Sequence, residues 1–192
     1  VDGRVLGGDW GNHSYSSRDV FFTAEAGRMY TVKYEFFDNA GEATVTFSAG
    51  QMDMNKLESL VEESDNVIFC GGFDSSTEGE GFDRPFKLPS GQLRMMNMLS
   101  ELTDRLVVVL NAGGGVDFNG WSEKVNAVLM AWYPGQEGGT ALAEIISGKI
   151  SPSGKLPISI ENVWEDNPVH DSYYDRRNVP HKRIEYKEGI FV

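Results

Sequence analysis

The segment 71–89 carries the side chains with the greatest potential for chemistry. It is rich in acidic residues, and Glu80 lies between two glycines, which let a backbone come close to a ligand. Phe82 and Phe86 follow and could provide an apolar face that raises the pKa of a carboxyl group or stacks on a sugar. Loops of about 15 residues or more are uncommon in α/β units and tend to be functional. We therefore interpret the segment as a functional loop, against the alternative of a solvated acidic loop.

Other residues with chemical potential do not form a recognisable site. The glycines at 113–115 do not fit a dinucleotide-binding motif, because Phe118 stands where the last glycine is needed, and a tight turn is the better interpretation. The three histidines lack metal-ligand spacing, and there is no G-x-S-x-G motif for a nucleophilic serine. Cys70 is the single cysteine, which excludes an internal disulfide and a cysteine zinc cluster. We expect neither a metal nor a cofactor.

The spacing of apolar residues predicts the helices and strands that must position the loop. Helical spacing of apolar residues predicts helices over 52–64, 93–102 and 139–147, with a short helix at 121–125. Continuous apolar runs predict strands over 66–70, 106–110, 127–132 and 155–160. This alternation is typical of a doubly wound, mostly parallel α/β sheet. Ligands of such sheets bind at the carboxyl ends of the strands, where the loops 71–89, 111–120 and 133–139 are expected to meet.

The first fifty residues have a different pattern. The runs 20–23, 30–36 and 43–47 are apolar or alternate with a period of two, and turn residues separate them. They predict a few antiparallel strands of a β-sandwich, too few to close a sandwich alone. The sequence therefore predicts a junction near residue 50.

The composition excludes several classes of protein. The 192 residues are 40% hydrophobic and 24% charged, which excludes a disordered tail, a coiled coil and a collagen. The formal net charge of −12 disfavours a nucleic-acid partner. No apolar run approaches the ~18 residues that a membrane-spanning helix requires, so we expect no membrane partner. The chain begins at Val1 without a signal peptide, and both ends look cut from a longer protein.

Four motifs resemble glycoside hydrolase family 3. The run Glu-Gly-Glu-Gly-Phe-Asp-Arg at 78–84, with Leu-Pro at 88–89, is similar to the acid/base loop of that family. The runs 128–139, 151–157 and 186–192 are similar to its C-terminal α/β sandwich domain. Residues 34–45 resemble the end of the protective-antigen-like β-sandwich that some β-glucosidases of the family carry. The resemblance thus implies two parts, 1–50 from the β-sandwich and 51–192 from the α/β sandwich domain.

The resemblance implies part of a retaining β-glycosidase of the β-glucosidase type. Glu80 matches the acid/base, whereas the nucleophile of the family lies on an N-terminal barrel domain of the same protein. The substrate would be a β-linked oligosaccharide or glycoside, with Phe82 and Phe86 as substrate-binding residues. Asp9 lies in a Gly-Asp-Trp run that we interpret as a chance match to the nucleophile motif. Glu78 is interpreted as solvated, and the chain alone is expected to be inactive.

Two alternatives from other classes remain. One is a non-catalytic carbohydrate-binding or structural α/β module, which an upstream barrel with a nucleophile motif would rule out. The other is a flavodoxin-like nucleotide-binding protein, which the absence of any phosphate-binding motif disfavours.

Overall fold

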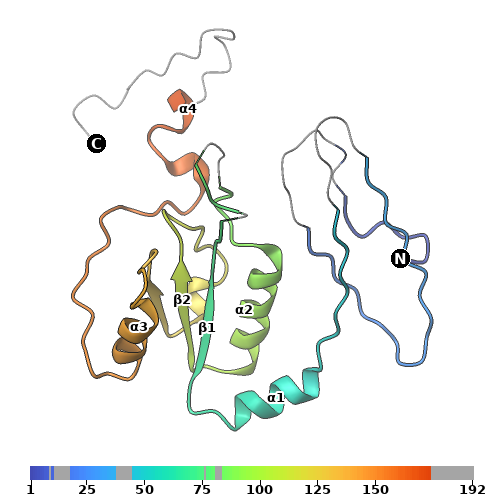
Figure 1. Ribbon diagram of the computed structural model, residues 1–192, viewed down its shortest axis with the longest axis horizontal. Coiled ribbons are helices and arrows are strands. Elements are labelled where there is room, and N and C mark those ends of the chain that lie inside the picture. Colours follow the sequence, from blue (N-terminus) through green and yellow to red (C-terminus); the bar gives the residue numbers. More distant parts are fainter. Residues whose placement is uncertain (9, 11–17, 38–44, 76, 81–83, 174–192) are drawn as a thin grey trace. The chain divides into compact units, whose positions relative to one another are not determined.

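The computed structural model describes residues 1–8, 10, 18–37, 45–75, 77–80 and 84–173 (Figure 1). The chain divides into two compact units, Val1–Leu60 and Val61–Val192. The helix α1, Met54–Glu62, spans the point of division. The domain boundary predicted near residue 50 stays a prediction.

A parallel sheet of three strands forms the centre of the second unit. The strands β1 (Val67–Gly72), β2 (Leu106–Asn111) and β3 (Ala127–Met130) lie in the order β1-β2-β3. Cys70 is in register with Val109, which is in turn in register with Leu129. The middle strand is the most deeply buried, because it has a neighbour on each side. Four of its side chains are at most 1% exposed, namely Leu106, Val108, Val109 and Leu110.

Helices connect and flank these strands. The helix α2 (Ser90–Leu102) links β1 to β2 and buries Met96 and Leu99. A 3₁₀ turn, η1 (Ser122–Lys124), precedes β3, and the helix α3 (Gly138–Ile146) follows it. In Figure 1, α2 lies on one side of the strands and α3 on the other. A second 3₁₀ turn, η2 (Trp164–Asp166), and the short helix α4 (His170–Tyr173) end the described chain.

Trp121, in the connection between β2 and β3, is buried in the core. It is 2% exposed, and its indole Nε1 donates a hydrogen bond of 2.8 Å to the carbonyl oxygen of Asp117. Its ring meets that of Phe118 edge-on, with 5.2 Å between centroids. A buried indole thus has its polar group satisfied, as burial requires.

The α/β class and its main elements are confirmed. Each of the helices predicted over 52–64, 93–102 and 139–147 is present with ends shifted by at most three residues, and the short helix predicted at 121–125 is the 3₁₀ turn η1. The strands predicted over 66–70, 106–110 and 127–132 are β1, β2 and β3.

The prediction of a strand over 155–160 is wrong. The chain there forms no strand, and Leu156 and Ile158 are 55% and 44% exposed. Pro157 stands between them and has no N–H to donate to a ladder, which weakens any pairing of this segment. An alternating apolar pattern shows that a segment could form a strand. It does not show that a second strand is present to pair with it.

The antiparallel strands predicted in the first unit also need correction. Residues 20–23, 30–36 and 45–47 form no strand, and 43–44 lie outside the described residues. Large apolar side chains there are exposed, for example Val32 at 50% and Phe36 at 57%. One attachment is clear: the carboxylate of Asp2 accepts hydrogen bonds from the Thr31 amide at 2.8 Å and from Arg28 at 3.0 Å. Since strands exist only as hydrogen-bonded pairs, an alternating pattern without a paired neighbour stays extended chain.

Truncation of the central strand tests this description of the core. Leu110→Ala removes a side chain that is 0% exposed, so the free energy of unfolding should fall by about 2–5 kcal/mol. Leu156→Ala is the matched control, because the same change at a 55% exposed position should cost no more than about 0.5 kcal/mol. Urea unfolding followed by circular dichroism measures both. Equal losses in the two variants would contradict the assignment of β2 as the core strand.

Candidate active site

The loops that follow the three strands meet at the carboxyl edge of the sheet. Glu78, in the loop after β1, lies within hydrogen-bond distance of Gly113 after β2 and of Tyr133 after β3. The convergence predicted for the loops 71–89, 111–120 and 133–139 is therefore observed. Parallel strands produce it, because all their carboxyl ends lie at the same edge.

The carboxylate of Glu78 is the centre of this meeting point. Its Oε2 accepts a hydrogen bond of 2.5 Å from the hydroxyl of Tyr133 and one of 3.1 Å from the amide of Gly113. Its Oε1 forms an ion pair of 3.3 Å with Nε of Arg84. The Glu78 side chain is only 22% exposed. We call Glu78, Arg84, Gly113 and Tyr133 the Glu78 cluster.

Arg84 extends the cluster to the end of the same loop. Its Nη2 donates a hydrogen bond of 2.7 Å to the carbonyl oxygen of Gly115, and its Nη1 donates one of 3.2 Å to that of Pro85. The guanidinium lies 4.5 Å above the ring of Phe73, a cation–π contact, and the side chain is 14% exposed. A guanidinium that is held by Glu78, two carbonyl groups and a ring has little conformational freedom left.

Glu78 was predicted to be solvated, and this prediction is wrong. The sequence shows Glu78 and Glu80 as two similar acids in one polar loop, and only the fold brings an arginine, a phenol and an amide to the first of them. Arg84 and Tyr133 are functional candidates that the sequence analysis missed. The available signal for Tyr133 was its place directly after a strand, at the edge where ligands bind.

The glycine run after β2 is explained by close approach. A Cβ atom on Gly113 would lie 2.5 Å from Oε1 of Glu78, and one on Gly114 would lie 3.0 Å from Nη2 of Arg84. At Gly115 an added Cβ would find ordinary contact distances of 3.6 Å or more. The Gly113 amide, which a phosphate cradle would offer to a ligand, is already bonded to the carboxylate of Glu78. Gly113 and Gly114 thus leave room for the Glu78 cluster, and the tight turn predicted for this run stays a prediction.

The cluster shifts the pKa values of two of its members. Partial burial alone would raise the pKa of Glu78, but the hydrogen bonds from Tyr133 and Gly113 and the charge of Arg84 outweigh it and lower that pKa. Desolvation of the hydroxyl end, together with the Glu78 carboxylate beside it, raises the pKa of Tyr133 to about 12, although 53% of the side chain is exposed. At neutral pH Glu78 is therefore an anion, and both of its carboxylate oxygens already contact donors of the protein. A carboxylate that carries no proton cannot act as the acid.

The backbone before Tyr133 is strained. Trp132 has φ 54°, a left-handed conformation that is rare for bulky residues. Such a residue costs of order 1–3 kcal/mol and persists only where the surroundings hold it. The strain lies at the residue next to the phenol that donates to Glu78.

The residues predicted from the sequence have the following places. Glu80 is exposed, two residues beyond the Glu78 anchor. Phe86 is partly buried, and its carbonyl oxygen accepts a hydrogen bond of 3.0 Å from the amide of Asp117. Phe82 and Asp9 lie outside the described residues. Glu80 and Phe86 lie in the loop after β1, which also carries Glu78 and Arg84 of the cluster.

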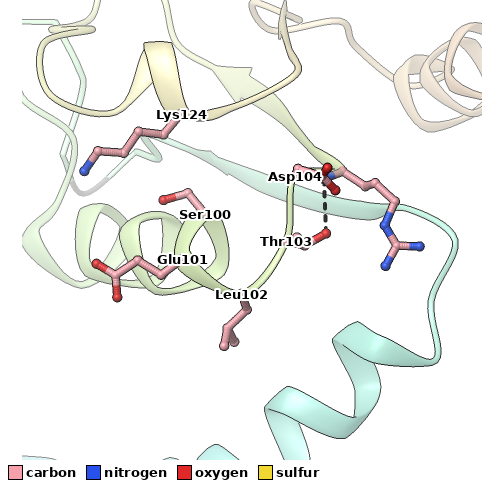
Figure 2. A pocket seen from close by; sticks show the side chains of 7 residues that line it. Ser100, Glu101, Leu102, Thr103, Asp104 and Lys124 are labelled. Carbon is pink, nitrogen blue, oxygen red and sulfur yellow. Dashed lines mark hydrogen bonds between the residues drawn. The ribbon is translucent and has the colours of Figure 1, made fainter.

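One open hollow of the second unit lies elsewhere. It has a volume of about 640 Å³ and is lined by residues 100–105 and Lys124 (Figure 2). These residues end α2 and lead into β2, so the hollow lies at the opposite edge of the sheet from Glu78. Its lining mixes charges of both signs and lacks a buried polar side chain that could orient a ligand, so it has no evident role in catalysis.

Metal-binding clusters and membrane-spanning helices are absent from the described residues. These residues contain no group of three histidine, cysteine, aspartate or glutamate side chains placed to hold a metal ion. Within the same part of the chain, no helix combines the length and the apolar character needed to cross a membrane.

Acid should weaken the Glu78 cluster. The pKa of Glu78 is lower in the folded chain than its ordinary value of 4.5, so the stability gained from its ionised form is full above that pH. It is lost as the pH falls through the lowered value. Glu78→Gln should therefore reduce the free energy of unfolding by about 1–3 kcal/mol at pH 7, and the difference from wild type should shrink towards about pH 3.

Urea unfolding at the two pH values measures this difference. Glu123→Gln is the control, because Glu123 is exposed and should change stability by no more than about 0.5 kcal/mol at either pH. A Glu78→Gln difference that is the same at both pH values would show that the ionised carboxylate is not what stabilises the cluster.

Comparison with known proteins gives the family. The family model described as "Glycosyl hydrolase family 3 C-terminal domain" matches residues 9–192. A probable beta-glucosidase J from Neosartorya fischeri is 36% identical over 131 residues, covering 68% of this chain and 15% of that protein. A beta-glucosidase from Rhizobium radiobacter is 30% identical over 205 residues, covering 100% of this chain and 25% of that protein.

Solved structures agree with the sequence comparison. The crystal structure of a GH3 beta-glucosidase from Bifidobacterium adolescentis has a TM-score of 0.61 and 32% identity, over 77% of this chain and 22% of that one. A beta-glucosidase from Kluyveromyces marxianus in complex with glucose has a TM-score of 0.58 and 29% identity, over 64% and 15% of the two chains. The chain thus spans 15% to 25% of the length of these two curated relatives. The resemblance seen in the sequence motifs is confirmed, and the chain belongs to the glycosyl hydrolase family 3 C-terminal domain family.

Proposed function

We propose that this chain is the acid/base-bearing part of a retaining β-glycosidase of the β-glucosidase type. Glu80 is the proposed acid/base, and a barrel domain elsewhere in the same protein would provide the nucleophile. The substrate would be a β-linked oligosaccharide or glycoside cleaved at its terminal β-glycosidic bond. The observation that carries this proposal is the contrast between the two loop glutamates: Glu78 is bound by the protein, and Glu80 is exposed at the carboxyl edge of the sheet.

The proposed chemistry needs two carboxyl groups on opposite sides of the scissile bond. In retaining enzymes they are about 5–5.5 Å apart. The nucleophile attacks the anomeric carbon while the acid/base gives its proton to the departing oxygen, which leaves a covalent glycosyl intermediate. The same residue, now ionised, removes a proton from water, and the water releases the sugar.

The environment of the loop favours Glu80 over Glu78 for this role. An acid must be protonated before it reacts, whereas Arg84, Tyr133 and the Gly113 amide hold Glu78 as an anion. Two carboxyl groups with different surroundings can divide the tasks, one binding the protein and the other serving the reaction. Among the described residues none donates a hydrogen bond to the Glu80 carboxylate, so it is available to a substrate.

Phe82 and Phe86 are proposed to form part of the sugar-binding wall next to Glu80. Sugar rings present apolar faces that aromatic rings can cover, and an apolar wall also favours the protonated acid. Phe86 lies in the same loop, and its ring lies 3.7 Å from the position that a Cβ of Gly115 would take. The support for Phe82 is its place two residues after Glu80.

Removal of Glu80 should affect substrates according to their leaving groups. In the full-length protein, Glu80→Ala should lower kcat/KM for cellobiose by about 10²–10⁴-fold, because its leaving group needs protonation. Glycosylation by a dinitrophenyl glucoside should be spared, since that leaving group departs without a proton. The intermediate would then hydrolyse slowly, and azide should restore turnover by replacing the water that has lost its base.

Stopped-flow and steady-state kinetics on the two substrates measure these effects. Glu123→Ala is the control, since it removes an exposed carboxylate outside the loop and should leave both rates within about twofold. The 192-residue chain alone should not hydrolyse either substrate, because an acid without its nucleophile cannot form the intermediate. Uniform loss on both substrates without azide rescue would remove Glu80 from the acid/base role, and turnover by the isolated chain would contradict the need for a barrel.

A further inference from the structure

We propose that Glu78 is a positioning residue that holds the Glu80 loop in the geometry required for proton transfer. The proposal rests on the function proposed above, because it needs Glu80 as acid/base. It names the Glu78 cluster, formed by Glu78, Arg84, Gly113 and Tyr133, as a clamp between the loop after β1 and the loops after β2 and β3.

The clamp has contacts on both sides of Glu80 along the chain. Glu78 lies two residues before it and is bonded to Gly113 and Tyr133. Arg84 lies four residues after it and is bonded to the carbonyl oxygen of Gly115. The ion pair of Glu78 with Arg84 joins the two anchor points directly. Glu80 is only two residues from the anchored Glu78, and a segment that short between a fixed point and the reacting group limits how far its carboxyl group can move.

The local contacts of the loop strengthen the first anchor. The amide of Glu78 donates a hydrogen bond of 2.8 Å to the carbonyl oxygen of Asp74, and the hydroxyl of Thr77 donates one of 3.1 Å to the same oxygen. The amide of Asp74 in turn donates to the Thr77 hydroxyl at 2.9 Å. Glu78 is thus held by its backbone as well as by its carboxylate, and its side chain has a defined direction.

The chemistry of an acid/base makes such a clamp useful. Proton transfer requires the carboxyl group to reach the departing oxygen at hydrogen-bond distance. A displacement of about 1 Å can reduce the rate by about 10²-fold. The Glu80 loop is attached through Glu78 to residues that directly follow two strands of the sheet, which limits the displacement of the reacting group. The cost of the strained Trp132 backbone is consistent with a contact that is maintained for this purpose.

The charge balance of the loop gives Glu78 a second task. Arg84 is 14% exposed and would be left without its carboxylate partner if Glu78 were neutral. Glu80 lies four residues before Arg84 in the same loop and is one of the acids there that could compete for the guanidinium, the other being Asp83. Glu78 therefore keeps Arg84 occupied, which leaves Glu80 available to the substrate.

The test compares Glu78→Gln with Glu80→Ala in the full-length protein, on cellobiose and on a dinitrophenyl glucoside. Glu78→Gln keeps the size of the side chain and removes its charge. It should lower kcat for cellobiose by about 10–100-fold and leave the rate of glycosylation by the dinitrophenyl substrate within about threefold. A residue that only stabilises the fold would lower both rates together, so the dependence on the leaving group identifies a positioning effect.

A glycine substitution in the loop after β2 provides a test that leaves Glu78 in place. Gly113→Ala places a methyl group 2.5 Å from the Glu78 carboxylate and should reproduce the selective loss on cellobiose. Gly139→Ala in α3 is the matched control, because its methyl group would meet no atom within 4 Å and should change the rate by less than about threefold. If Glu78→Gln fails to fold, Tyr133→Phe and Gly113→Ala decide the question.

The outcomes separate the two proposals. If Glu80→Ala shows its selective loss and azide rescue, but Glu78→Gln and Gly113→Ala act equally on both substrates or have no effect, the positioning proposal is overturned and the acid/base assignment stands. If Glu80→Ala itself shows no selectivity, the proposed function fails first. Azide rescue of Glu78→Gln to the extent seen for Glu80→Ala would instead make Glu78 the acid/base and overturn the positioning role.

Discussion

The contact between one carboxylate and three different loops is the constraint on which the candidate site depends. Parallel strands bring the loops after β1, β2 and β3 to one edge of the sheet, but they do not determine how these loops are arranged there. The Glu78 carboxylate does so, since it bonds to Gly113, Tyr133 and Arg84 at once. Three donors on one partly buried carboxylate compensate for the loss of water around its charge.

Other features of the edge accompany this contact. Gly113 and Gly114 lack side chains where a Cβ would meet Glu78 and Arg84. Trp132 adopts a left-handed backbone next to the phenol that donates to the carboxylate. The same contact explains why two glutamates in one short loop differ: Glu78 is bound by the protein, and Glu80 is exposed. Because the chain belongs to a glycosyl hydrolase family, this difference bears on which of the two glutamates we propose as the acid/base.

The sequence predicted the sheet well, because a buried parallel strand has a simple signature. The continuous run of valines and leucines in β2 predicts a strand that is buried on both faces. The same logic failed for Ile158 and for the alternating residues before position 50. There, apolar residues are exposed, and no neighbouring strand pairs with them among the described residues. Pairing depends on partners that a local pattern does not reveal.

The site was predictable in part. The loop and Glu80 could be found from the glycines, the acids and the resemblance to a family, and the meeting of the loops followed from strand direction. The partners of Glu78 could not be predicted from the sequence, because Tyr133 lies 55 residues away in the chain and only the fold brings it close. Two acids that look alike in a polar loop acquire different roles from contacts of this kind.

The most direct test of the account is the position of the two glutamates in a working active site. A crystal structure of the full-length protein, with a fluorinated glucoside trapped on its nucleophile, would show both carboxylates and the sugar. We expect the Glu80 carboxylate to lie about 5–5.5 Å from the nucleophile and to face the anomeric carbon, while Glu78 keeps its bonds to Tyr133 and Arg84. A structure in which Glu78 faces the sugar, or in which Glu80 points away from it, would contradict the account.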